Sequence, residues 1–197
     1  MDAFETVIAS ILDRQGFWTR TEVKIELTKQ EKRDIGRASS PRWELDVVGY
    51  KATTNEIRVV ECKSYLDSPG VSAKDLIYSD SRYSKRYKLF HENNTRDVVF
   101  GRLLKQFYQQ GLCQRNSKIT LCLAAGKVRN DVDRDAIHSY FKKKGWIFMD
   151  PELIKSELQL LVDSGYENSV ATVTAKVLLR GATSNNTIQP TTKVAAD

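Results

Sequence analysis

The chain has 197 residues, of which 41% are hydrophobic, and this suits one domain that buries a core. Its formal net charge of +6 at pH 7 favours acidic partners, of which nucleic acid is the commonest. The three cysteines show no CxxC spacing, which argues against a disulfide framework. The N-terminal segment is acidic, unlike a signal peptide, and the apolar runs are too short for a membrane span. We therefore expect a cytoplasmic protein.

The first half of the chain predicts one helix followed by three strands. Apolar residues recur at helical spacing near the N-terminus, and a glycine ends the pattern. Apolar and charged residues then alternate, as in a strand with one solvent-exposed face. The expected elements are, in order, a helix at residues 3–15, a strand at 22–27, a loop at 30–42, and two strands at 43–50 and 56–65 that form a hairpin.

The second half predicts alternating helices and strands after a long basic loop at residues 66–94. This loop shows no clear periodicity apart from a short helix near 73–78, and loops of such length in a compact domain are usually functional or mobile. The elements expected after it are a helix at 94–110, a strand at 118–126, a helix at 131–144, a strand at 145–150, and helices at 151–163 and 168–180.

The order of these elements predicts an α/β fold with a mixed sheet flanked by helices. The first three strands should be antiparallel, because short turns join them, and the later strands should be parallel because helices connect them. We expect a single domain over residues 1–180. Residues 181–197 are rich in Thr, Ser and Asn and predict a flexible tail.

Charged side chains occur where the second and third strands should be buried. Glu61 and Lys63 share one face of an otherwise apolar strand, and Asp46, on the same face of its strand as Val48, can lie beside Glu61. Unpaired burial of such charges costs several kcal/mol each. A divalent cation between the carboxylates would offset this cost, and Mg²⁺ fits because it prefers oxygen ligands. The alternative is an exposed ion pair between Glu61 and Lys63 on an edge strand.

The spacing of these residues resembles a known nuclease motif. Asp46, a gap of fourteen residues and then Glu61-Cys62-Lys63 are similar to the motif of the PD-(D/E)XK nuclease superfamily, which includes restriction endonucleases and Holliday-junction resolvases. Its restriction-endonuclease-like core runs α-β-β-β-α-β, the order expected here over residues 4–126. One letter departs from the motif, because no proline directly precedes Asp46.

The resemblance implies a metal-dependent endonuclease that hydrolyses phosphodiester bonds in DNA. Its cofactor would be Mg²⁺, for which Mn²⁺ could substitute, and no nucleotide cofactor is implied. Asp46 and Glu61 would bind the metal, and the backbone carbonyl of Cys62 would add a ligand. Lys63 would orient or deprotonate the attacking water and stabilise charge in the transition state.

Two further residues are candidates through the same resemblance. Glu5 on the first helix matches a place where many members carry an extra acidic metal ligand, and Glu22 is its rival for that role. The alternative for Glu5 is a structural role, in which its charge interacts favourably with the helix dipole. Gln106 matches a catalytic position on the helix after the motif, and its alternative is a solvated helix residue. Glu44 is a supporting candidate behind the metal ligands.

Basic residues gather in the two loops that flank the motif strands. The second loop interleaves them with Tyr83 and Tyr87, which suits phosphate contacts combined with stacking. Solvated loop charges are the simpler alternative. The residues expected to bind nucleic acid are Lys32, Arg33, Arg37, Arg82, Lys85, Arg86 and Lys88.

Other functions remain open at the level of sequence. A non-catalytic nucleic-acid-binding or assembly module could keep the same fold, and a third option is a nuclease that acts on RNA. The acid–acid–lysine set favours a nuclease, because a decayed site would more readily have lost one of these residues. The expected partner is DNA, with no membrane partner, and a homodimer is an open alternative to a monomer.

Overall fold

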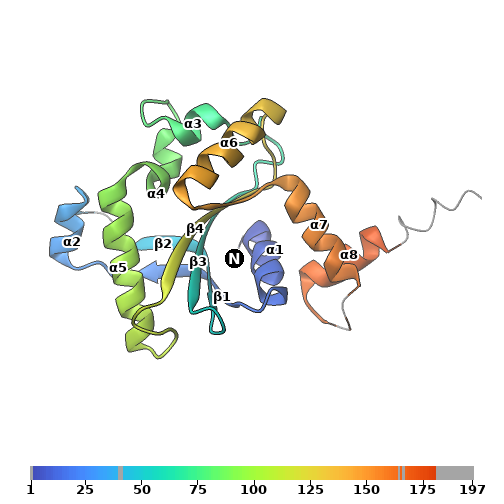
Figure 1. Cartoon of the computed structure of the whole chain (residues 1–197), viewed down its shortest axis with the longest axis horizontal. Helices are drawn as coiled ribbons and strands as arrows, with labels where there is room; N and C mark the ends of the chain where they lie inside the picture. Colours follow the sequence, from blue (N-terminus) through green and yellow to red (C-terminus); the bar gives the residue numbers. More distant parts are fainter. Residues whose placement is uncertain (1, 40–41, 164, 166, 181–197) are drawn as a thin grey trace, which may run out of the picture.

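A five-stranded mixed sheet between two layers of helices forms the centre of the molecule (Figure 1). The computed structural model describes residues 2–39, 42–163, 165 and 167–180. The strands lie side by side in chain order, with β1–β3 antiparallel and β4 and β5 parallel to β3. Their bounds are Trp18–Ile25 for β1, Trp43–Lys51 for β2, Glu56–Lys63 for β3, Lys118–Ala125 for β4 and Ile147–Met149 for β5.

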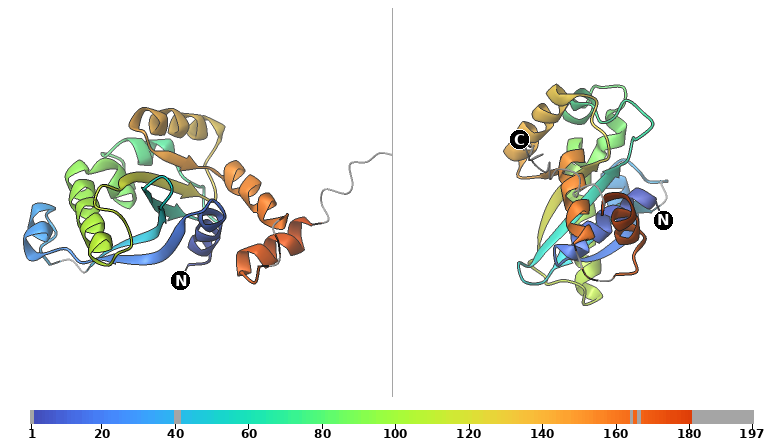
Figure 2. Two further views of the ribbon diagram at one scale, coloured as in Figure 1. Left: turned by 60° about the horizontal axis from the view of Figure 1, so that its bottom comes forward. Right: turned by 90° about the vertical axis from the view of Figure 1, so that its right-hand side faces the viewer.

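Each face of the sheet is covered by its own helices, as Figure 1 shows with α5 on one side and α1 on the other. The first face carries α3 (Ala73–Ile77), the 3-10 helix η1 (Ser84–Tyr87), α4 (Lys88–His91), α5 (Asn93–Gln109) and α6 (Asp131–Lys144). The second face carries α1 (Ala3–Arg14), α7 (Pro151–Val162) and α8 (Val170–Leu179), and Figure 2 shows α8 at the outer end of this layer. The short helix α2 (Lys29–Asp34) lies beside α5.

Two apolar cores result from this arrangement, one on each face. Side chains along β3 alternate between the two cores. Ile57 and Val59 enter the core under α5, while Val60 enters the core under α1. These residues are fully buried because β3 is the middle strand of the sheet. The predicted α/β fold with a mixed sheet is therefore confirmed. Within the described residues, no helix is both long enough and apolar enough to cross a membrane.

Most predicted elements agree with the structure to within a few residues, because local signals mark their ends. Asp2 caps α1 through its carboxylate, and Asn130 caps α6 in the same way. Gly145 ends α6 in the left-handed conformation, with φ at 68°. The helix predicted at 131–144 has the same bounds as α6. The tail predicted at 181–197 lies outside the described residues.

The loop predicted at residues 30–42 is corrected by the structure, because its first part is the helix α2. Thr28 and Glu31 form a reciprocal capping box at the start of this helix. Arg102 on α5 then binds the Glu31 carboxylate through both Nε and Nη2, at 2.7–3.1 Å. The contact with Arg102 therefore stabilises a short helix that the local sequence alone does not predict.

The long loop predicted at residues 66–94 is also corrected, since it contains α3, η1, α4 and the start of α5. The short helix expected near 73–78 is confirmed as α3. Val71 pairs with Val128 as an isolated parallel bridge, which attaches the segment to the chain that follows β4. The side chains of Leu76, Tyr87 and Phe90 enter the core. Tertiary burial holds a segment whose sequence shows no repeating pattern.

Candidate active site

The topology of the sheet brings the motif residues to one edge. Because β3 and β4 are parallel, their carboxyl ends lie at the same edge, and the antiparallel β2 begins there. The β2–β3 ladder extends to the pair Val47 and Val60. Beyond this pair, Asp46 Oδ2 accepts a hydrogen bond of 2.7 Å from the backbone N–H of Cys62. The Asp46 carboxylate thus fixes the end of the two strands next to Glu61.

The regular alternation of β2 is interrupted at Asp46. Leu45 and Val48 both belong to the core under α5, whereas Val47 belongs to the core under α1. Simple alternation along β2, which would place Leu45 and Val47 on one face, therefore fails here. On β1, Glu22 lies opposite Asp46 between two paired residues and has a φ of 53°. This local distortion accompanies the turn of the Asp46 side chain toward β3.

The three motif side chains form a half-buried cluster. Lys63 Nζ lies 3.5 Å from Glu61 Oε2 and 4.0 Å from Asp46 Oδ2. The exposed fractions of the side chains are 17% for Lys63, 14% for Glu61 and 25% for Asp46. Since β3 is paired on both sides, the alternative of an ion pair on an exposed edge strand is wrong. The predicted meeting of Asp46, Glu61 and Lys63 is confirmed.

Burial and crowding of charge shift the titration of this cluster. Burial raises the pKa of Glu61 to about 7; the Asp46 charge adds to the rise and the Lys63 ammonium opposes it. Burial by itself would lower the pKa of Lys63, but the carboxylates of Glu61 and Asp46 more than offset it, and the pKa rises. At neutral pH Lys63 therefore carries its charge.

Glu5 on α1 adds a third carboxyl group next to Asp46. Burial raises the pKa of Glu5 to about 7, and the charge of Asp46 is the second cause. Glu5 Oε2 is buried and has no hydrogen-bond partner among the described residues. A buried oxygen without a partner costs free energy unless another group satisfies it. This placement favours Glu5 over Glu22 as the extra acid, and direct metal ligation by Glu5 stays a prediction.

The oxygen donors of the cluster fit a Mg²⁺ ion for which the protein supplies only some of the ligands. The described residues contain no group of three or more His, Cys, Asp or Glu side chains arranged to hold a metal. Mg²⁺ usually binds one or two carboxylates and completes its shell with water and substrate phosphate, so Asp46 and Glu61 suffice. The thiol of Cys62 packs against the second core and burial raises its pKa, so the prediction for Cys62 concerns its carbonyl alone.

A cationic cleft of about 330 Å³ opens beside the cluster. It joins the carboxylates to basic residues from the two segments that flank the motif strands. Its lining comprises Arg37, Arg42, Trp43, Glu44, Asp46, Glu61, Lys85, Arg86, Lys88 and Leu89. Four of the residues predicted to bind nucleic acid thus share one cleft with the acids. The Arg37 guanidinium also lies 4.6 Å from the centre of the Trp43 ring.

The remaining predicted residues lie elsewhere. Lys32 and Arg33 lie on α2 and do not line the cleft. Arg82 lies over the Tyr83 ring at 5.3 Å, also outside the cleft. In their place the cleft contains Arg42, the last residue of the basic loop expected before the Asp46 strand.

The structure does not bring Gln106 to the carboxylates. Its side-chain amide accepts a hydrogen bond from Glu26 N at 3.2 Å and donates one to Lys24 O at 2.9 Å. Both partners belong to the backbone of β1 and the residue after it, so the amide attaches α5 to the edge of the sheet. These hydrogen bonds give Gln106 a structural role, and its catalytic role stays a prediction. The sequence could not show which face of α5 meets the site.

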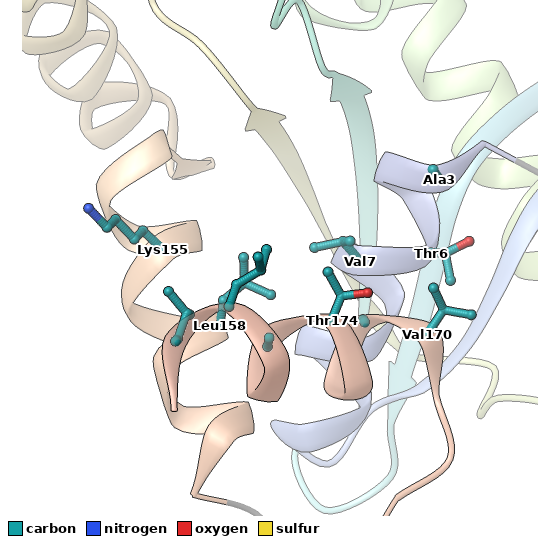
Figure 3. Close-up of a pocket in the computed structure, with 11 residues that line it drawn as sticks. Ala3, Thr6, Val7, Lys155, Leu158, Val170 and Thr174 are labelled. Carbon is teal, nitrogen blue, oxygen red and sulfur yellow. The ribbon is translucent and has the colours of Figure 1, made fainter. Parts of the chain in front are cut away.

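A second, apolar groove of about 590 Å³ lies between α1, α7 and α8 (Figure 3). Val7, Leu158 and Val170 point into it, and Thr6 and Thr174 also line it. Such a lining contains no paired acid and base that could activate a nucleophile. The cationic cleft is therefore the better candidate for an active site.

Comparison of the chain with protein-family models, with curated proteins and with solved structures gives no match. The functional assignment rests on the residues and their geometry. Asp46, Glu61 and Lys63 lie together, and basic residues line the cleft beside them.

Proposed function

We propose that the protein is a Mg²⁺-dependent endonuclease of the PD-(D/E)XK type that hydrolyses phosphodiester bonds in DNA. The observation that carries the proposal is the half-buried cluster of Asp46, Glu61 and Lys63 at the mouth of a cationic cleft. Acids that bind a metal, a lysine that stays charged and a surface for phosphates are what hydrolysis of a polyanion requires.

The order of elements supports a restriction-endonuclease-like core. The sequence α1-β1-β2-β3-α5-β4 contains the helix, the three antiparallel strands, the second helix and the fourth strand, with α2 and the short helices as insertions. The acids come from β2 and β3, as the motif requires. A degenerate motif gains weight when it lies on the expected elements.

The chemistry can be assigned to named groups. Asp46 and Glu61 would hold Mg²⁺, which when bound supplies Lewis acidity and lowers the pKa of water. The ammonium group of Lys63 lies next to both acids, where it can orient the attacking water and stabilise negative charge on the phosphate in the transition state. Arg37, Lys85 and other cations of the cleft would hold the neighbouring phosphates.

A substitution at Lys63 tests this function directly. Lys63→Ala should lower turnover by about 10²–10⁴-fold while DNA binding stays within a few-fold, because the ammonium acts mainly in the transition state. Lys63→Arg should also lose most of its rate, since the guanidinium is larger and planar. The measurement is cleavage of linear, circular and branched DNA with Mg²⁺, with Mn²⁺ and with EDTA.

Lys51→Ala is the matched control for this experiment. Lys51 is also half-buried, but it lies at the opposite end of β2 and donates a hydrogen bond to Gln15 O. It should cleave at the wild-type rate once folded. Wild-type protein that binds DNA and cuts none of the substrates would favour the non-catalytic binding module instead. Cleavage of RNA in preference to DNA would reassign the substrate.

A further inference from the structure

A second cavity of about 420 Å³ adjoins the cationic cleft. Three tyrosines and two arginines make up half of its lining, namely Tyr65, Tyr83, Tyr87, Arg86 and Arg129, and Asp75 is the one acid among the described residues that line it. The volume lies within the ~300–1,000 Å³ that small-ligand sites usually have. Rings and guanidinium groups together suit a flat, polar and negatively charged ligand, and a nucleotide has all three properties.

The cavity is physically continuous with the proposed active site. Arg86 lines both the cleft and the cavity. Tyr65 follows Lys63 by two residues and has a φ of 46°, a conformation that residues with a side chain rarely adopt. A hydrogen bond between Tyr65 and Arg86 raises the pKa of Arg86. A ligand in the cavity would therefore lie next to a phosphate bound at Asp46 and Glu61.

Backbone hydrogen bonds join residues 70–71 of the cavity wall to the segment that carries Arg129. Val71 N donates to Lys127 O at 2.9 Å, and Arg129 N donates to Val71 O at 3.0 Å. A side chain at Gly70 would lie 2.8 Å from the backbone of Val128, so the two segments approach as closely as glycine permits. The cavity is thus largely formed before a ligand arrives, which reduces the entropy cost of binding.

Tyr83 is the aromatic group most available for stacking. Its side chain is 42% exposed, whereas Tyr87 is 2% exposed and belongs to the core. Arg86 and Arg82 lie over the Tyr83 ring at 4.8 and 5.3 Å. Guanidinium groups therefore lie over the ring, and a base that stacks on Tyr83 takes the place of one of them. A base stacked here would have arginines beside its sugar and phosphate.

We propose that this cavity binds an unpaired nucleotide of the DNA next to the phosphate to be cleaved. The substrate class would then be DNA that carries a single-stranded segment or an overhang at the cut site, rather than uninterrupted duplex. Bases inside a duplex are stacked on one another and are not free to stack on Tyr83. This inference rests on the proposed nuclease function and specifies its substrate.

Binding of two DNA probes tests the inference. One probe is a blunt duplex and the other is the same duplex with a short single-stranded overhang that carries 2-aminopurine. Affinity is measured with Ca²⁺ in place of Mg²⁺, so that cleavage does not interfere. Wild-type protein should bind the overhang probe more tightly and change its 2-aminopurine fluorescence. Tyr83→Ala should lose about tenfold in affinity for this probe, as expected for one lost base–aromatic stack, and stay within about twofold on the blunt duplex.

Two further variants control the experiment. Tyr108→Ala removes an equally exposed tyrosine, 45% accessible and paired with Arg115 at 5.3 Å, which lies outside both cavities, and it should bind both probes like the wild type. Tyr83→Phe keeps the ring and should retain the preference. Equal wild-type affinity for both probes, or equal loss on both in Tyr83→Ala, would overturn the inference while cleavage of duplex DNA still upheld the nuclease. If the protein neither bound nor cut any DNA, both the inference and the proposed nuclease function would be wrong.

Discussion

At the scale of single residues, Glu5 is a buried carboxyl group in an unfavourable environment. Its Oε2 is buried without a partner in the described structure, and its neighbour Asp46 is another carboxylate. Proteins rarely keep such a group unless a ligand or a proton compensates for it. Here the proton does so, since burial first and Asp46 second raise the pKa of Glu5 to about 7.

The raised pKa of Glu5 predicts a pH-dependent effect on stability. In the unfolded chain Glu5 loses its proton near the ordinary pKa of 4.5, but in the folded protein it does so only near 7. The folded state therefore loses stability as the pH rises through this window. Glu5→Gln removes the loss and should raise the metal-free melting temperature at pH 8 by roughly 2–4 °C, or about 1 kcal/mol after allowance for solvent screening.

The gain should fall to a small fraction near pH 4.5, where Glu5 is protonated in the folded protein and about half-protonated in the unfolded chain. Thermal melts at the two pH values in EDTA provide the measurement. Glu152→Gln is the control, because its side chain is 64% exposed and lies on α7 outside the cleft. A gain of the same size at both pH values would show that packing, and not the charge of Glu5, is responsible.

The sequence could identify the acids and the lysine but not every residue around them. Asp46, Glu61 and Lys63 stand out because charge is unexpected on buried strands, and strand pairing then requires that they meet. Arg42 and Trp43 carry no such signal, since an arginine and an aromatic residue before a strand are unremarkable. Their role in the cleft depends on where the chain enters β2.

At the scale of elements, the hydrogen bonds of α5 support the sheet and the segment before β2. The edge strand β1 leaves backbone groups without strand partners, and Gln106 satisfies two such groups, Lys24 O and Glu26 N. Arg102, one turn earlier on α5, holds Glu31 of α2. The same helix therefore fixes both β1 and the segment that leads to Arg37.

This assignment predicts the behaviour of Gln106→Ala. Loss of two hydrogen bonds should lower the free energy of unfolding by about 1–2 kcal/mol, while turnover on DNA stays within about twofold of the wild type. Gln109→Ala, an exposed position on the same helix, should change neither quantity. Urea unfolding and cleavage rates under conditions where both proteins are folded would decide. Strongly reduced turnover with unchanged stability would return Gln106 to the catalytic site.

Elements that the sequence did not predict share one physical cause. α2, η1 and α4 are four to six residues long, and isolated helices of that length are unstable in water. They form because distant groups bind them, as Arg102 binds Glu31, or because their apolar side chains enter the core, as Leu89 and Phe90 do. The longer α6 could be located from its caps alone.

At the scale of the whole molecule, the topology turns a local pattern into an asymmetric charge distribution. The net charge of +6 is modest, but the sheet collects basic residues from two separate segments at the edge where β3 ends. A cleft with one dominant sign of charge attracts a polyanion and orients it. The pairing directions of the strands could be predicted from element types, and both basic segments were expected beside the motif strands, whereas tertiary structure was needed to show which of their cations line the cleft.

This distribution predicts that the salt dependence of DNA binding depends on where a charge is removed. Each phosphate contact contributes roughly 0.7–0.9 to the slope of log K against log salt, so the double variant Lys85→Ala, Lys88→Ala should reduce the slope by about 1.4–1.8. Both lysines line the cleft, and neither is assigned to the chemistry. The measurement is DNA affinity across a series of NaCl concentrations with Ca²⁺ present.

The control removes the same number of charges from the other end of the sheet. Arg115 and Lys118 are exposed and lie where β4 begins, opposite the edge that carries Lys63. Their double alanine variant has the same net charge as the cleft variant, so an effect of overall charge would appear equally in both. We expect it to keep the wild-type slope. Equal slopes in the two double variants would mean that DNA does not enter the cleft beside Asp46 and Glu61.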